Sequence, residues 1–113
     1  MTPTELLAQA QLLLQGLGDT VSGNASRLAA VVARQALEEC VLERCAAVGA
    51  GCEGASMRSR LLILRALDDR EIAEQLASLW SQLSACCHQH AYNLSPTVGE
   101  VRGLCEGVAA VAM

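Results

Sequence analysis

The sequence predicts an all-α protein, a five-helix antiparallel bundle. Leu, Ala and Val supply most of the apolar residues, while the chain has no Phe, one Trp and one Tyr, and this palette favours helices. Apolar residues recur at helical spacing in several segments. Ser, Thr, Asp and Pro stand at positions where they start helices.

The first two helices follow from the N-terminal half. Thr2 is a cap, Pro3 occupies the first helical position and Glu5 closes a capping box, so a helix is expected to run to about Leu17. A second helix is expected over residues 24–48, which lack Gly and Pro. Its first half is apolar almost all round and should contact several neighbours. Along the whole helix the apolar residues at helical spacing are Leu28, Val31, Val32, Leu37, Val41, Leu42 and Cys45.

Three further helices are expected after a loop that contains Gly49, Gly51 and Gly54. Ser56 caps a short helix that ends at Leu67, and its apolar run 61–64 should be core. Asp68 and Glu71 repeat the capping-box spacing and start a helix that should end near Tyr92. Ser95 and Pro96 open the last helix. The expected buried stripes are Ile72, Leu76, Leu79, Trp80, Leu83 and Cys87, and then Val98, Val101, Leu104, Cys105, Val108 and Val111.

Length and composition narrow the class of protein. With 113 residues, the chain is expected to form a single domain, residues 1–113. No apolar run is long enough for a membrane span, and no basic residue precedes the first leucine cluster, so we expect a cytoplasmic protein without a secretory signal. The six cysteines are then interpreted as reduced, buried core residues. A net charge of −4 argues against a free-standing nucleic-acid binder.

The segment 86–90, Cys-Cys-His-Gln-His, contains the ligand types that zinc prefers. Its spacing is poor for one ion, because adjacent helical residues point about 100° apart. We therefore expect no metal and interpret His90, which continues the apolar face of the fourth helix, as a core or interface residue. No nucleophile motif or phosphate-binding glycine loop is present, so no catalytic residue and no cofactor is expected.

The best candidate for a binding site is a run of cations without acids. Arg58, Arg60 and Arg65 lie in the short third helix, and Arg70 follows closely. Arg58 and Arg65 are seven residues apart, which returns them to the same helical face within about 20°. Such a pair would hold an RNA or DNA backbone or the acids of a neighbouring subunit. The alternative is a solvated face paired with Asp68, Asp69 or Glu71.

The segment 33–38, Ala-Arg-Gln-Ala-Leu-Glu, on a long helix followed by further amphipathic helices resembles the HEPN superfamily of small helical bundles. Segments 55–65 and 85–104 also look like proteins of GC-rich actinobacteria. The resemblance implies a helical bundle in a prokaryotic conflict system. Active HEPN ribonucleases place an Arg shortly before a His, but segments 81–83 and 83–85, which precede His88 and His90 at that spacing, contain none. The catalytic motif is thus missing.

In length and helix number the chain is also similar to the small helical subunits of CRISPR effector complexes, which lack an active site and contact nucleic acid through basic faces. This likeness implies a role for Arg58 and Arg65. We therefore expect a non-catalytic subunit of a prokaryotic defence or RNA-associated complex, whose partners are protein subunits and an RNA or DNA backbone, with no membrane and with self-association left open. Apolar surface on the second and fourth helices would form its interface. The alternative is a HEPN-like RNase or toxin that uses His88 or His90.

Overall fold

The computed structural model describes residues 2–16, 22–50, 52–88 and 96–112, and in them the chain forms five helices. These are α1 (Pro3–Gly16), α2 (Ser22–Ala47), α3 (Met57–Leu67), α4 (Arg70–Cys87) and α5 (Val98–Ala112). The described residues contain no strand. The prediction of an all-α, five-helix fold is confirmed.

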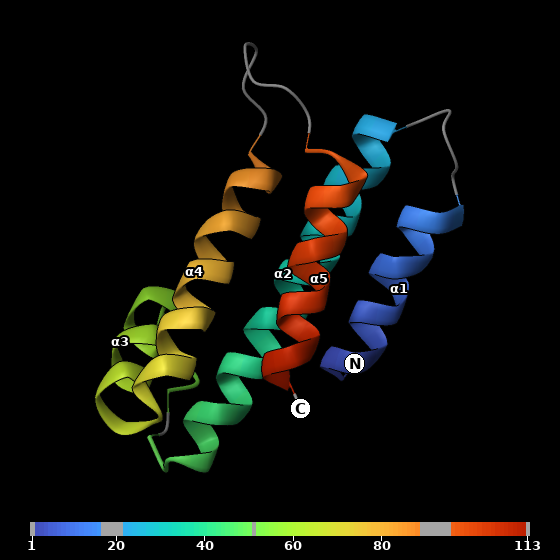
Figure 1. The fold of residues 1–113 in the computed structure, drawn as a ribbon. Coiled ribbons are helices and arrows are strands. Elements are labelled where there is room, and N and C mark those ends of the chain that lie inside the picture. Colours follow the sequence, from blue (N-terminus) through green and yellow to red (C-terminus); the bar gives the residue numbers. More distant parts are fainter. Residues whose placement is uncertain (1, 17–21, 51, 89–95, 113) are drawn as a thin grey trace.

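Helix α2 lies at the centre of the fold. It packs against all four other helices, as its apolar character predicted, and α5 also contacts α1 and α4. Figure 1 shows that α1, α2, α4 and α5 run in alternating directions, while the short α3 lies at the outer side of the first half of α4. In this outer position α3 has a single buried residue, Leu64.

The buried face of α2 consists mainly of alanine. Ala29, Ala30, Ala33 and Ala36 are fully buried, together with larger side chains such as Leu37. Leu28 and Val31, which the sequence placed in the buried stripe, are instead exposed. Small side chains let the neighbouring helices approach α2 closely on several sides, and they leave room for the leucines of those neighbours. The stripe predicted for α2 is therefore wrong at its N-terminal end.

The apolar run of α3 is not core as a whole. Leu64 is fully buried, Leu61 and Ile63 are half-buried, and Leu62 is exposed. Four consecutive helical residues point in all directions, so a helix that packs on one side can bury only part of such a run. The stripes of α4 and α5 are largely confirmed. Their fully or nearly buried members are Leu76, Leu79, Leu83, Val101, Cys105 and Val108.

The predicted starts of α1 and α3 are confirmed by hydrogen bonds. The hydroxyl of Thr2 accepts from the backbone N–H of Glu5 at 3.1 Å, and that of Ser56 accepts from Ser59 N–H at 3.2 Å. At α5 the cap is Thr97, whose hydroxyl accepts from Glu100 N–H at 3.0 Å. The last helix therefore begins at Val98 and not at Pro96, because the Thr97 hydroxyl provides the cap. Ser95 lies outside the described residues.

Two predicted boundaries of α4 are wrong. Its N-cap is Asp69, which accepts from the N–H groups of Glu71 and Ile72, and not Asp68, which ends α3. Helix α4 ends at Cys87, with His88 as an extended C-cap, and not near Tyr92. Tyr92 and His90 lie outside the described residues.

The loop predicted around Gly49 is confirmed, and Gly49 ends α2 in a left-handed conformation with φ of 74°. Its N–H donates to the carbonyl of Ala46 and the N–H of Ala50 donates to that of Cys45, each at 3.0 Å. This pair of bonds is the Schellman motif, which favours glycine at the left-handed position.

The cysteines are free, and Cys40, Cys45, Cys52 and Cys105 are buried as predicted, whereas Cys86 and Cys87 are half-buried. Burial raises the pKa of Cys40, Cys45 and Cys105 to about 11. These three thiols therefore remain protonated at neutral pH, and protonated thiols are poor nucleophiles and poor metal ligands.

Helix α5 offers a stability test at two of its glycines. Gly103→Ala should raise the free energy of unfolding by about 0.5–1 kcal/mol, because a helical Ala loses less backbone entropy than Gly and no atom lies within 4 Å of the new methyl group. Gly107→Ala should gain less, because its methyl group would lie 2.8 Å from Cδ2 of Leu79. Urea unfolding of both variants measures the difference. Equal gains would contradict the close approach of α5 to Leu79.

Candidate functional site

The four arginines singled out in the sequence lie in different environments. Arg60 donates from Nε to the carbonyl of Cys52 at 3.0 Å and from Nη2 to that of Glu53 at 2.9 Å. Arg70 pairs with Glu74 one helical turn later, at 3.5 Å. Arg58 and Arg65 are exposed, and no ion pair within the described part of the chain involves either of them. Only this last pair is thus left for a partner.

Arg58 and Arg65 lie on the same side of a groove between α3 and α4, with a volume of about 390 Å³. Its lining is mostly apolar: α3 contributes Arg58, Leu61, Leu62 and Arg65, and α4 contributes Ala73, Glu74, Ala77 and Trp80. Leu62 is 60% exposed although it lines this groove. The predicted pair therefore shares a surface with exposed apolar side chains.

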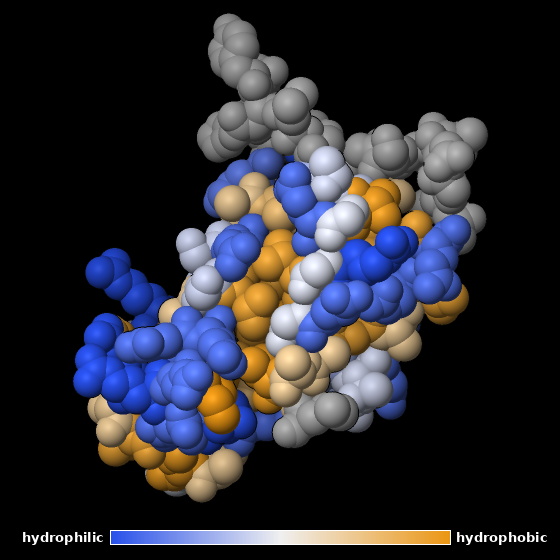
Figure 2. All heavy atoms as spheres, in the orientation of Figure 1, coloured by the Kyte–Doolittle hydropathy of each residue, from blue (hydrophilic) through white to orange (hydrophobic). Residues whose placement is uncertain are grey.

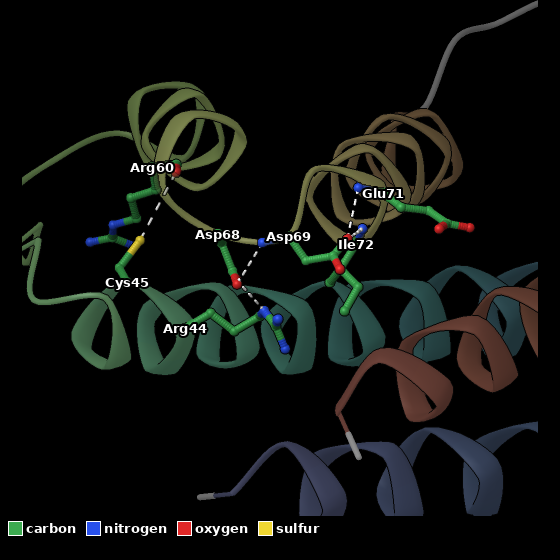
Figure 3. Close-up of polar contacts among 7 residues, drawn as sticks. All are labelled: Arg44, Cys45, Arg60, Asp68, Asp69, Glu71 and Ile72. Atoms are coloured by element: carbon green, nitrogen blue, oxygen red, sulfur yellow. Dashed lines mark hydrogen bonds and ion pairs between the residues drawn. The ribbon is translucent and has the colours of Figure 1, made fainter.

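Asp68 and Asp69 form the turn that connects α3 to α4, the two helices that line the groove (Figure 3). Arg44 of α2 donates from Nε to Oδ2 of Asp68 at 2.7 Å, and Asp69 N–H donates to Oδ1 of the same carboxylate at 2.8 Å. The hydrogen bond from Arg44 lowers the pKa of Asp68, against the opposite effect of burial. Asp68 thus ties the turn between the groove-forming helices to α2, whereas the sequence had offered it to the arginines of α3.

Trp80 connects the groove to α2. The guanidinium carbon of Arg34 lies 4.1 Å from the centroid of the Trp80 ring, a cation–π contact. Trp80 also lines the α3–α4 groove. In the sequence Arg34 stands out only within the segment 33–38, because its contact with Trp80 arises when α2 and α4 pack together.

A second hollow, of about 710 Å³, lies between α4 and α5. Figure 2 shows hydrophobic atoms along the seam between these helices, bordered by hydrophilic side chains. Leu79, Cys86 and Leu104 contribute apolar atoms, while Gly99 and Gly103 leave the space open. This seam has no exposed arginine in its lining, so it lacks the combination of charge and apolar surface found between α3 and α4.

The segment 86–90 can be described only as far as His88. Within the described ranges, no group of three or more His, Cys, Asp or Glu side chains could hold a metal ion. His88 lies beyond the last turn of α4, so it does not continue the helical face of Cys86 and Cys87. His90 lies outside the described residues.

None of the helices in the described part of the chain is long and apolar enough to cross a membrane. Comparison with protein-family models, with curated proteins and with solved structures found no match to the chain. The α3–α4 groove is therefore characterised by its own chemistry: two exposed cations beside an apolar floor, on a compact all-helical fold.

Proposed function

We propose that this chain is a non-catalytic subunit of a larger assembly and that it binds a neighbouring protein through the α3–α4 groove. The observation that carries the proposal is the lining of the groove, where Leu62 is 60% exposed between two arginines that form no ion pair with another described residue. Exposed apolar surface bordered by charge is typical of protein interaction sites.

The chemistry of the groove favours an amphipathic helix with acidic residues as its occupant. The apolar side of such a helix would cover Leu61, Leu62 and Trp80, and its carboxylates would pair with Arg58 and Arg65. A nucleic-acid backbone would meet only two cations over an apolar floor, on a chain with a net charge of −4. A protein partner therefore fits the lining better than a phosphate backbone does.

The biological setting of this assembly, a prokaryotic defence or RNA-associated complex, is part of the proposal and rests on the resemblance to HEPN proteins and to CRISPR small subunits. In such a complex the chain would bind neighbouring protein subunits directly. Its link to RNA would be through those subunits. We propose no catalytic step, since the Arg-to-His motif of active HEPN ribonucleases is missing.

A matched pair of leucines tests the groove. Leu62 and Leu67 are both on α3 and both 60% exposed, but only Leu62 lines the groove. In copurification from the native host, Leu62→Ser should reduce the yield of the bound protein partner at least about tenfold, whereas Leu67→Ser should not, because one buried leucine contributes a factor of this size to binding. Equal yields for the two variants would contradict the proposal.

Charge reversal gives an independent comparison in the same assay. Arg58→Glu should release the partner, while Arg102→Glu, an equal change at an exposed position of α5, should retain it. Nuclease treatment before elution separates the two kinds of partner. Retention of the partner after nuclease supports a direct protein contact, and its loss after nuclease would show that nucleic acid, and not the groove, holds the complex together.

A further inference from the structure

A second pair of arginines, Arg27 and Arg34, lies on α2 with the same seven-residue spacing, so that both point to one side of that helix. On α4, Trp80, Ser84 and Cys87 share one face for the same reason. These two faces meet where the Arg34 guanidinium lies over the Trp80 ring. Because α2 and α4 run in opposite directions (Figure 1), the seven residues from Arg34 back to Arg27 match the seven from Trp80 on to Cys87, so Arg27 lies toward the last turn of α4. Its charge opposes the effect of burial on the pKa of the Cys86 and Cys87 thiols.

This cluster contains polar groups without partners. The Nε atoms of Arg27 and Arg34 and the hydroxyl of Ser84 are buried, and none of the three has a hydrogen-bond partner within the described part of the chain. No ion pair within the described residues involves either arginine. Buried donors in native proteins are nearly always satisfied, by protein, water or a bound ligand. A group of three unsatisfied donors from two facing helices thus indicates a missing acceptor.

Within the described ranges, no ion pair balances the charge of the cluster. The C-terminal end of α4 supplies about half a negative charge through its free carbonyl groups, against the two positive charges of Arg27 and Arg34. Glu100 of α5 acts on the Cys86 thiol, but it forms no ion pair with either arginine. Burial raises the pKa of the Cys86 and Cys87 thiols, so these remain neutral and add no negative charge at neutral pH.

We propose that Arg27, Arg34 and Ser84 form a binding site for a phosphate group, such as that of a phosphate monoester. Two guanidinium groups and a hydroxyl match the double charge and the several acceptor oxygens of a phosphate better than the single charge and two oxygens of a carboxylate. Both arginines are partly exposed as residues while their Nε atoms are buried, so a ligand from solvent would reach Nε through a movement of the side chain. This site is separate from the α3–α4 groove and does not depend on the function proposed for that groove.

Trp80 is the only tryptophan of the chain and lies under Arg34, so its fluorescence reports on the site. Titration of the wild-type protein with inorganic phosphate should change the Trp80 emission in a saturable way, and NaCl at the same ionic strength should not. Arg27→Gln, which leaves the Arg34–Trp80 contact in place, should weaken phosphate binding at least about tenfold, the effect of losing one charge-assisted hydrogen bond. Arg70→Gln, at the opposite end of α4, is the matched control and should bind like the wild type.

Several results would overturn the proposal. These are a phosphate response no larger than that to NaCl, equal binding by Arg27→Gln and Arg70→Gln, and acetate binding as tight as phosphate binding. An oligoribonucleotide without terminal phosphate that binds through Arg27 when free phosphate does not would assign the site to a nucleic-acid backbone instead. Circular dichroism checks folding. If Arg27→Gln is unfolded, Arg27→Lys keeps the charge and should still weaken binding, because it loses the planar fork, and unchanged affinity in that variant would also reject the site.

Discussion

Replacing Leu37 with Ala should lower the free energy of unfolding by about 2–5 kcal/mol, whereas the same replacement at Leu28 should change it by less than about 0.5 kcal/mol. Leu37 is fully buried on α2, and truncation removes its apolar contacts and leaves a cavity among fixed neighbours. Leu28 lies on the same helix but is 53% exposed, so its truncation leaves no cavity. Urea unfolding followed by circular dichroism measures both changes.

This comparison tests which side of α2 faces the core. The sequence alone places both leucines in one stripe, and the two substitutions have the same effect on helix propensity. Equal losses of stability at the two positions would show that Leu28 is covered in the folded protein, either within the chain or by a second copy. A dependence of the Leu28→Ala effect on protein concentration would identify the second copy, because self-association stabilises the folded state by mass action.

The number and type of the helices could be predicted because their signals are local. The caps Thr2 and Ser56 and the left-handed Gly49 act within one turn of the chain, so their sequence context was sufficient. The same local signal could not decide which of two neighbouring aspartates caps α4. Asp68 and Asp69 can each cap a helix, and the distant Arg44 decides between them by binding Asp68.

The buried face of α2 could not be predicted from the spacing of large apolar residues, because alanines form most of it. The alanines of α2 point to several sides of the helix. Which of these sides is buried depends on the neighbouring helices that pack there. The bulky Leu28 and Val31 are exposed, whereas Ala29, Ala30 and Ala33 are buried. Close packing around a central helix favours small residues at the contacts. The spacing of large apolar residues therefore does not indicate the buried face.

The candidate groove was predicted in part. Helical periodicity placed Arg58 and Arg65 on one face, and the structure places both in the lining of one groove. The groove itself depends on α4, which contributes Ala73, Ala77 and Trp80, and no local pattern of α3 indicates this. Arg27 and Arg34 carry the same spacing signal, but their significance depends on Ser84 and on the unsatisfied Nε atoms, which only the packed helices reveal.

Trp80 lies between the two proposed sites. It lines the α3–α4 groove and contacts Arg34 of the α2–α4 cluster. A ligand that draws the Arg34 guanidinium away from the ring would free that side of Trp80, and a helix in the groove would restrict the ring. Any difference in partner affinity caused by phosphate must be matched by an equal difference in phosphate affinity caused by the partner. The two sites can therefore be tested for coupling once each has been measured alone.

Replacing Asp68 with Asn should lower the free energy of unfolding by about 1–3 kcal/mol at pH 7, the contribution of a hydrogen bond between charged groups. The side chains of Arg44 and Asp68 are only 28% and 17% exposed, so water screens the pair less than it screens a surface pair. Asp68 also orients the turn between α3 and α4 through the bond from Asp69 N–H. Urea unfolding measures the loss, and a double-mutant cycle with Arg44→Met separates the ion pair from the turn.

The effect of Asp68→Asn should depend on pH in one direction. Because the hydrogen bond from Arg44 lowers the pKa of Asp68 in the folded protein, the carboxylate stabilises the fold fully above its unfolded pKa of about 3.9. This contribution is lost as the pH falls through the lower folded value. The gap between wild type and Asp68→Asn should therefore be constant from pH 7 to about pH 5 and should narrow at lower pH. A gap that stays constant to about pH 2 would show that Asn disturbs the packing of the turn, since protonation of Asp68 would then cost the wild type no stability and the gap could not come from the lost charge.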